Sequence, residues 1–200
     1  RAAEWQADML FVHHGLFWGK PEPVAGIMFN RISSLIHNGI ALYAAHLPLD
    51  SQAEIGNNAA MAQALGLTGI TPFGEYKGRK IGYKGTFTSP ETIDTILSAL
   101  GLHREDCLSI HPFGKSRISN VGIVSGGAAR EVTDALREKL DLFITGDASH
   151  EIYHVCLEGH INCISAGHYQ TEVWGVKQLA EKLTKETGLE TTFLDIPTGL

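Results

Sequence analysis

The segment Met9-Leu-Phe-Val-His-His-Gly15 decides the fold that the sequence predicts. A short apolar run that ends in polar residues and a glycine is typical of a buried strand that opens into a loop. Residues 23–37 carry apolar side chains at helical spacing, and residues 40–45 form a second apolar run. A further helix is expected over residues 53–65. This alternation of strands and helices predicts a parallel sheet with helices packed on it.

The rest of the chain continues this pattern with one β-rich interruption. Residues 78–87 are polar and punctuated by glycines, which favours a hairpin. The strand 121–124, the helix 128–140 and the strand 142–145 are expected to form a βαβ unit. We therefore predict an α/β fold with mixed or mostly parallel sheets and flanking helices. The remaining predicted elements are helices over 90–100, 151–158 and 171–184, and strands over 107–111, 161–165 and 191–194.

The composition is that of a soluble globular protein. Of 200 residues, 44% are hydrophobic and 19% are charged, and the longest apolar runs are too short to span a bilayer. The net charge is -6 with acidic and basic residues interleaved, which argues against a nucleic-acid-binding surface. The first residues are polar and show no signal peptide. We therefore expect a cytoplasmic protein, not bound to a membrane, whose partner is a small molecule or another protein.

The histidine and cysteine counts restrict the kind of metal site. Ten histidines stand against three cysteines, Cys107, Cys156 and Cys163, which form no CxxC pair. An odd number of cysteines without ligand spacing indicates reduced thiols in a cytosolic protein. If the protein binds a metal, its ligands are therefore expected to be imidazoles and carboxylates rather than thiolates.

Ligand-type side chains follow several of the predicted strands. Functional residues in open α/β sheets collect at the carboxyl ends of strands. Glu172 follows His168 by four residues, so both side chains can reach one ion from a single helix face. Adjacent histidines at a strand end can each hold one of two ions, with a carboxylate between the ions. These candidate ligands are His13, His14, His46, Asp50, His168 and Glu172.

Each candidate also has an interpretation without a metal. The pair His13 and His14 can be a chance feature of a loop, and Asp50 can be the N-cap of the following helix. His168 and Glu172 can be a solvent-facing pair at a helix start. Only the convergence of these residues at strand ends favours a metal site over these alternatives.

Two other features are interpreted as structural. Ser125-Gly-Gly127 lies between a strand and a helix, as a phosphate cradle does, but it lacks the spacing of known phosphate-binding motifs. A turn is therefore expected there. Phe17 and Trp18 could stack on a planar substrate, although core packing is the role that we expect.

Four segments resemble motifs of one known protein family. They are LFVHHGLFWGK (residues 10–20), AHLPLD (45–50), LFITGDASH (142–150) and AGHYQTE (166–172). Together they resemble the NIF-three-like family, also called GTP cyclohydrolase I type-two homologues, in its short bacterial-like form. The similarity runs in order from Met9 to Leu183, and the combination of the first and last segments is specific.

The resemblance implies a dinuclear metal centre. In that family, residues at five of these positions hold two divalent ions. Glu172 would bridge the ions, with His14 and Asp50 on one ion and His13 and His168 on the other. The implied ligands are therefore His13, His14, Asp50, His168 and Glu172.

The resemblance also implies the surroundings of the centre and the assembly. His46 and His150 match positions close to the centre, where they would orient ligands or face the substrate. The two-lobed architecture would place residues 1–70 plus 160–200 in a metal-binding lobe and residues 71–159 in a second lobe. Family members form ring-like hexamers built from dimers, so a homohexamer is expected. The metal can be Zn, Fe, Mn, Ni or Co, because imidazole and carboxylate ligands suit all of them.

Three features differ from the family pattern. The opening strand and helix that usually precede the first motif are absent, so the sequence is expected to be truncated or unusual. The middle of the chain lacks the long inserted domain that some members carry. Leu47 stands where threonine is common, which leaves the polarity around Asp50 open.

The sequence favours a metal-dependent hydrolase. Two ions would lower the pKa of a bridging water and polarise the substrate, while Glu172 or His46 shuttles the proton. A triphosphate site has no obvious basic cluster, since Lys77, Arg79 and Lys80 are the nearest candidates. The sequence therefore favours a smaller phosphorylated or nitrogen-heterocyclic substrate over GTP.

Two other functions stay open. A non-enzymatic metal-binding protein or interaction scaffold would have a sealed site, because catalytic metal sites keep a position for water or substrate. A nucleotide-binding domain without a metal would hold its ligand at Ser125-Gly-Gly127. A ligand-sized pocket at the predicted centre would favour the hydrolase.

Overall fold

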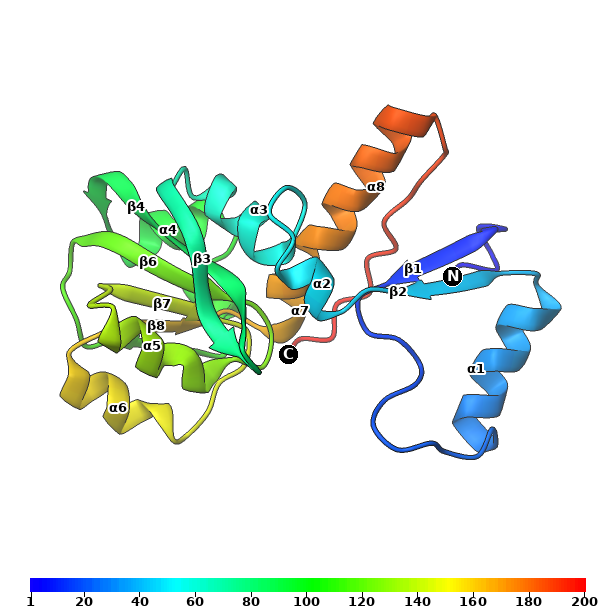
Figure 1. The fold of residues 1–200 in the computed structure, drawn as a ribbon, viewed down its shortest axis with the longest axis horizontal. Helices are drawn as coiled ribbons and strands as arrows, with labels where there is room; N and C mark the ends of the chain where they lie inside the picture. Colours follow the sequence, from blue (N-terminus) through cyan, green and yellow to red (C-terminus); the bar gives the residue numbers. More distant parts are fainter.

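A computed structural model describes residues 1–200, which form two separate sheets (Figure 1). The smaller sheet holds β1 (Met9–Val12) and β2 (Ala41–Ala44), which pair in parallel and are joined through α1 (Gly26–His37). Phe11 and Tyr43 stand opposite each other in this register and stack with ring centroids 5.6 Å apart. The predicted strand–helix–strand unit is therefore confirmed.

The larger sheet has six strands in the order β3-β4-β6-β7-β8-β5. Its centre is parallel, because β6 pairs with β7 and β7 with β8, whereas the outer pairs are antiparallel. A crossover helix joins parallel neighbours, while the antiparallel β3 and β4 need only a tight turn. The strands are β3 (Thr68–Tyr76), β4 (Arg79–Glu91), β5 (Ser109–Pro112), β6 (Ile118–Val124), β7 (Leu142–Thr145) and β8 (Asn162–Ser165).

Helices lie on both faces of the larger sheet and connect it to the smaller one (Figure 1). They include two short 3-10 turns, η1 (Arg104–Asp106) and η2 (Ala129–Glu131). The α-helices are α2 (Leu47–Asp50), α3 (Asn57–Ala64), α4 (Ile93–Ala99), α5 (Val132–Arg137), α6 (Ile152–Gly159), α7 (His168–Glu172) and α8 (Trp174–Thr187).

Alternating side chains of the central strands divide the core into two clusters. Ile144 and Ile164 belong to the cluster that α3 and α4 cover, whereas Phe143 and Cys163 belong to the cluster under α5 and α6. Every residue of β7 and β8 is buried, as expected for central strands covered on both faces. Each fully buried large apolar side chain contributes roughly 1.5–3 kcal/mol, so this double core holds the ends of β6, β7 and β8 rigidly in place.

The predicted hairpin begins earlier than expected. Residues 78–87 form most of one strand, β4, and its partner is the preceding β3. The two strands are joined by the two-residue turn Lys77-Gly78. The signal was missed because Lys-Gly is an unusual turn pair, whereas Asn-Gly and Asp-Gly are the common ones.

The C-terminal segment differs from its prediction in two ways. The helix expected over residues 171–184 is two helices, α7 and α8. The strand expected over 191–194 does not form, because Thr191 donates a hydrogen bond to the Ala180 carbonyl and Phe193 lies against the Lys177 ammonium. These contacts fix the segment on α8, away from any strand partner.

The proposed division into residues 1–70 plus 160–200 and residues 71–159 stays a prediction. Strand β8 belongs to the first of these groups in sequence, and it pairs with β7 and β5 in the larger sheet. None of the helices has the length and apolar character that crossing a membrane requires.

Candidate metal centre

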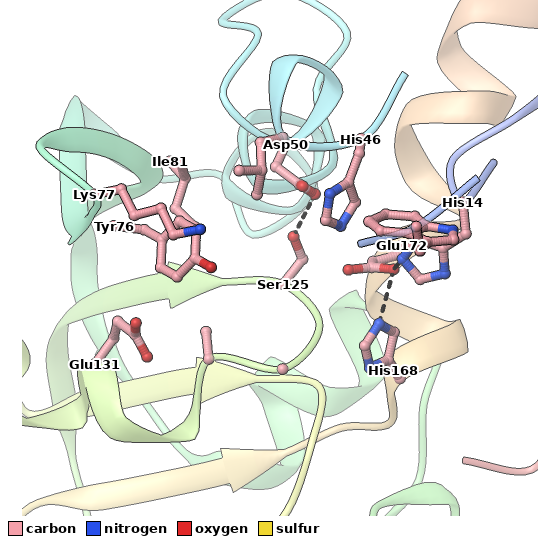
Figure 2. Close-up of a pocket in the computed structure, with 14 residues that line it drawn as sticks. His14, His46, Asp50, Tyr76, Lys77, Ile81, Ser125, Glu131, His168 and Glu172 are labelled. Carbon is pink, nitrogen blue, oxygen red and sulfur yellow. Dashed lines mark hydrogen bonds and ion pairs between the residues drawn. The ribbon is translucent and has the colours of Figure 1, made fainter. Parts of the chain in front are cut away.

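Segments that follow three strands converge in the region between the two sheets (Figure 1). His13 and His14 follow β1, His46 follows β2, and Glu172 ends α7, the helix after β8. One ligand atom from each of these four side chains lies within 4.8 Å of all the others, so the cluster can hold a metal ion. Figure 2 shows His14, His46, His168 and Glu172 gathered at one side of a pocket. Each segment follows the carboxyl end of a strand that has a parallel partner, as expected, but the strands belong to two sheets, so the cluster forms between the sheets.

Glu172 lies at the middle of this cluster. Its Oε2 is 3.0 Å from the Nε2 atoms of both His14 and His168, and 3.5 Å from that of His13. His168 and Glu172 share one face of α7, as their spacing predicts. The alternative of a solvent-facing pair is wrong, because Glu172 is only 9% exposed.

Asp50 adjoins the cluster through His13. Its Oδ2 lies 3.4 Å from His13 Nε2, while its Oδ1 accepts hydrogen bonds from Asn57 Nδ2 (2.9 Å) and Ser125 Oγ (2.8 Å). These bonds hold one carboxylate oxygen in place and direct the other towards His13. Asp50 ends α2, and the N-cap of the following helix α3 is Gly56, so the N-cap interpretation of Asp50 is wrong.

The protonation of the cluster indicates that it suits a cation. His13 Nε2 and His168 Nε2 are buried and face carboxylate oxygens, but these contacts lack the alignment of a hydrogen bond. Burial lowers the pKa of His13, but the nearby Asp50 and Glu172 carboxylates more than offset this and raise it to about 10. Interaction with Glu172 raises the pKa of His168 to about 9. Burial opposes ionisation of Glu172, yet the three imidazoles hold the pKa of that carboxyl far below its usual range.

This donor set fits a divalent transition metal. Buried imidazole nitrogens without hydrogen-bond partners, next to ionised carboxylates, are the ligands that Zn, Fe, Mn, Ni and Co accept. The cluster contains no thiol, and Cys156 and Cys163 are buried in the core cluster that α5 and α6 cover. The expected ligand chemistry of imidazole and carboxylate therefore agrees with the geometry.

Two further contacts orient the imidazoles. His13 Nδ1 lies 2.9 Å from the Ala45 carbonyl oxygen, and His168 Nδ1 lies 2.8 Å from Asp147 Oδ1. Each contact keeps a proton on Nδ1, so Nε2 is the nitrogen that can bind a metal once its own proton is released. Asp147 is not among the predicted site residues, although it follows β7 and so satisfies the same strand-end rule as the others.

The turn Ser125-Gly-Gly127 forms one wall of the centre. The backbone N–H of Ser125 donates to Asn58 Oδ1 and that of Gly126 donates to Thr171 Oγ1, so neither is free for a phosphate. Gly126 has a φ of +65°, and a Cβ at this position would overlap Glu172 Oε1. The interpretation as a turn is confirmed, and glycine is required because the backbone runs directly against the Glu172 carboxylate.

The cluster borders a pocket of about 650 Å³ (Figure 2). Trp18 lines the pocket and sets its ring edge-on to His46 and His14, with centroids 4.7 and 5.6 Å apart. Trp18 is 52% exposed and Phe17 is 76% exposed, so the core packing predicted for them is wrong. The pocket is large enough for a small-molecule ligand.

The two histidines that were expected near the centre occupy different surroundings. His46 belongs to the cluster, with its ring 5.0 Å from that of His13 and 5.1 Å from that of His14. Burial lowers the pKa of His46, and the neighbouring His13 lowers it further. His150, in contrast, is exposed and does not line the pocket.

Comparisons with known proteins agree on one family. The family model described as Duf34/NIF3 (NGG1p interacting factor 3) matches residues 1–199. A Treponema pallidum (strain Nichols) protein named GTP cyclohydrolase 1 type 2 homolog is 43% identical over 232 residues, covering 100% of this chain and 81% of the relative. A protein of the same name from Deinococcus radiodurans is 43% identical over 200 residues, covering 100% of this chain and 76% of the relative.

Solved structures have the same fold. The protein ybgI, described as of unknown function, superposes with a TM-score of 0.88 at 34% identity, covering 100% of this chain and 79% of that chain. TTHA1606 from Thermus thermophilus has a TM-score of 0.87 at 39% identity, covering 100% of this chain and 78% of that chain. The predicted α/β fold with its NIF-three-like architecture is therefore confirmed.

Proposed function

Because this chain belongs to the Duf34/NIF3 family, we propose that it binds two divalent metal ions and hydrolyses a small molecule at that centre. The observation that carries this proposal is the convergence of imidazoles and carboxylates on one side of a pocket of about 650 Å³. Five protein ligands for two ions leave coordination positions open, as catalysis requires. The proposed ligands are His13, His14, Asp50, His168 and Glu172.

The distances favour one division of these ligands between the ions. Glu172 Oε2 is equally close to His14 and His168, so we assign these two imidazoles to one ion. His13 Nε2 is 3.4 Å from Asp50 Oδ2, so we assign this pair to the second ion, with Glu172 as the bridge. This division differs from the one that the family resemblance implies, which pairs His14 with Asp50 and His13 with His168.

Divalent ions at such a centre would activate a water molecule and polarise the substrate. We assign proton transfer to His46, because it lines the pocket beside the cluster and is not among the five proposed ligands. Glu172, the other catalytic residue predicted from the sequence, is held by three imidazoles, which suits a bridging ligand better than a proton shuttle.

The charge of the pocket favours a substrate with fewer phosphate groups than GTP, whose cyclohydrolase gives the relatives their name. Lys77 is the single lysine or arginine that lines it, whereas Arg79 and Lys80 do not. A triphosphate would leave most of its charge without a protein counterion. We therefore propose a small phosphorylated or nitrogen-heterocyclic substrate, with Trp18 as an aromatic wall for a planar group.

The open pocket also bears on the competing functions. A non-enzymatic metal protein or scaffold needs no space for a substrate beside the metal, so the pocket favours the hydrolase. A nucleotide site at Ser125-Gly-Gly127 has less support, because the amides of its first two residues are already bonded within the protein. The ring-like hexamer stays a prediction.

The proposed hydrolase is tested by screening turnover. Wild-type protein, loaded in turn with Zn, Mn and Fe, is assayed with phosphate monoesters, cyclic amides and GTP. We expect metal-dependent hydrolysis of one of these classes, reduced by about 100-fold or more in Glu172→Gln because the bridge loses its charge. The matched control Glu158→Gln changes an exposed residue of α6 and should retain full turnover. Equal activity in Glu172→Gln, or no turnover at all by metal-loaded protein, would contradict the proposal.

A further inference from the structure

The side of the pocket opposite the metal centre has a charge of its own. Figure 2 shows Tyr76, Lys77 and Glu131 across the pocket from His14 and His168. Lys77 lies at the tip of the β3–β4 hairpin, and no carboxylate comes within ion-pair distance of its ammonium. The pocket therefore has a metal-binding pole and an unpaired cationic pole.

The backbone at Lys77 is strained for a lysine. Tyr76 and Arg79 close the hairpin, so Lys77 and Gly78 are its two turn residues, with φ of +50° and +77°. Two left-handed residues define a type I′ turn, in which asparagine, aspartate or glycine is preferred at the first position. A side chain with a Cβ and a long stem gains nothing from this conformation. An uncommon residue held in a strained turn beside a pocket points to a role for its side chain.

Two neighbours of Lys77, Tyr76 and Glu131, affect how its ammonium would interact with an anion. Its Nζ lies 5.1 Å from the centroid of the Tyr76 ring, which orients the ammonium without neutralising it. Glu131 lines the same side of the pocket, and burial raises the pKa of its carboxyl. A charged Glu131 would oppose the binding of an anion near Lys77, so its removal should strengthen such binding.

We propose that Lys77 is the residue that binds an anionic group, a phosphate or a carboxylate, at the end of the substrate remote from the metal centre. An ammonium acts as a compact point charge for either group. The substrate would then be a small molecule with a hydrolysable group at one end and an anion at the other. The inference rests on the proposed function, because the metal centre holds the first of these ends.

Two-ended chelators test this role without knowledge of the substrate. Alkyl hydroxamates bind metal ions through the hydroxamate, so a neutral series reports on the centre alone. A second series carries a terminal carboxylate and a third a terminal phosphonate, each over a range of chain lengths. Isothermal titration of the metal-loaded protein gives the affinity gain that the terminal charge produces.

We expect the charged compound of the best chain length to bind wild-type protein about three- to tenfold more tightly than its neutral counterpart, as for a partly exposed charge pair. Lys77→Gln should abolish this gain, and Glu131→Gln should increase it. Lys80→Gln removes the same charge from the same hairpin outside the pocket lining, so it should keep the gain. A phosphonate carries up to two charges and a carboxylate one, so a larger gain for phosphonate favours a phosphate only where it exceeds the effect of the extra charge, whereas a larger gain for carboxylate favours a carboxylate.

The failure of this inference is distinguishable from that of the proposed function. Hydroxamates that bind with no gain from either charge, or with a gain that Lys77→Gln retains, would overturn the role of Lys77 and leave the metal centre intact. If no hydroxamate binds metal-loaded protein, both the metal centre and the role of Lys77 are overturned.

Discussion

Gly126→Ala is expected to disable the metal centre while the fold survives. A Cβ at Gly126 would overlap Glu172 Oε1, lie 3.0 Å from Glu172 Cδ and lie 3.2 Å from His168 Nε2. The new methyl group therefore occupies the place of the central carboxylate. Because Thr171 of α7 accepts a hydrogen bond from the Gly126 N–H, the helix is held against this turn, and we expect Glu172 to yield by rotating away from the imidazoles.

The effect of Gly126→Ala has two parts, a loss of stability and a loss of metal affinity, and a control variant separates them. Alanine in the left-handed conformation costs roughly 1–2 kcal/mol at any such position. Gly101 has a φ of +71°, and a Cβ added there would meet nothing within 4 Å, so Gly101→Ala carries this backbone cost alone. In a chain of this size, that cost lowers the melting temperature by about 2–8 °C. Gly126→Ala should lose at least as much, and in addition weaken metal binding by more than about 100-fold, because a ligand is displaced.

The assay is thermal unfolding with and without added metal, together with metal affinity by isothermal titration. Gly101→Ala should bind metal as tightly as wild type and gain the same thermal stabilisation from it. Gly126→Ala should gain almost none. The reasoning is refuted if Gly126→Ala binds metal with wild-type affinity, since the turn would then not constrain Glu172.

Three further predictions concern residues in or beside the proposed metal centre. Asp147→Asn should weaken metal binding by about 10–100-fold through His168, and wild-type affinity in this variant would show that the contact does not orient the ligand. The pKa values of His13 (about 10) and His168 (about 9) mean that both imidazoles must lose a proton before they bind a metal. The metal affinity should therefore rise with pH up to about 9–10. Titrations in buffers of different ionisation enthalpy should show proton release at neutral pH, and a pH-independent affinity would contradict this. His46→Ala should keep the metal content but lower turnover by about 10²–10⁴-fold, whereas loss of metal would make His46 a ligand.

The sequence predicted the site where local pattern and topology coincide. The run Met9–Val12 and the residues that follow it define a strand end, and the spacing of His168 and Glu172 defines one helix face. These patterns predicted that each candidate follows the end of a strand, whereas the five-ligand set came from the family resemblance. The strands belong to two sheets, so local pattern alone does not explain why their ends meet. The same logic would have included Asp147, at the end of β7, had it been applied to every strand.

The parts that were missed depend on contacts that are distant in sequence. Trp18 is apolar and was expected in the core, but it borders the pocket because His46 and His14 lie beside it. Lys77 gains its position from the register of β3 with β4, which the weak turn signal of Lys-Gly did not reveal. The strand expected at 191–194 does not form, because this segment packs on α8 instead. Local strand propensity does not predict that contact.

The most direct test of the central claim is the metal content of the purified protein. Elemental analysis is made on wild type and on Glu172→Ala, both purified without chelators. A dinuclear centre predicts about two divalent ions per chain in wild type and a sharp fall in the variant. Wild-type protein that contains no metal, and that fails to bind added Zn, Mn or Fe, would contradict the account.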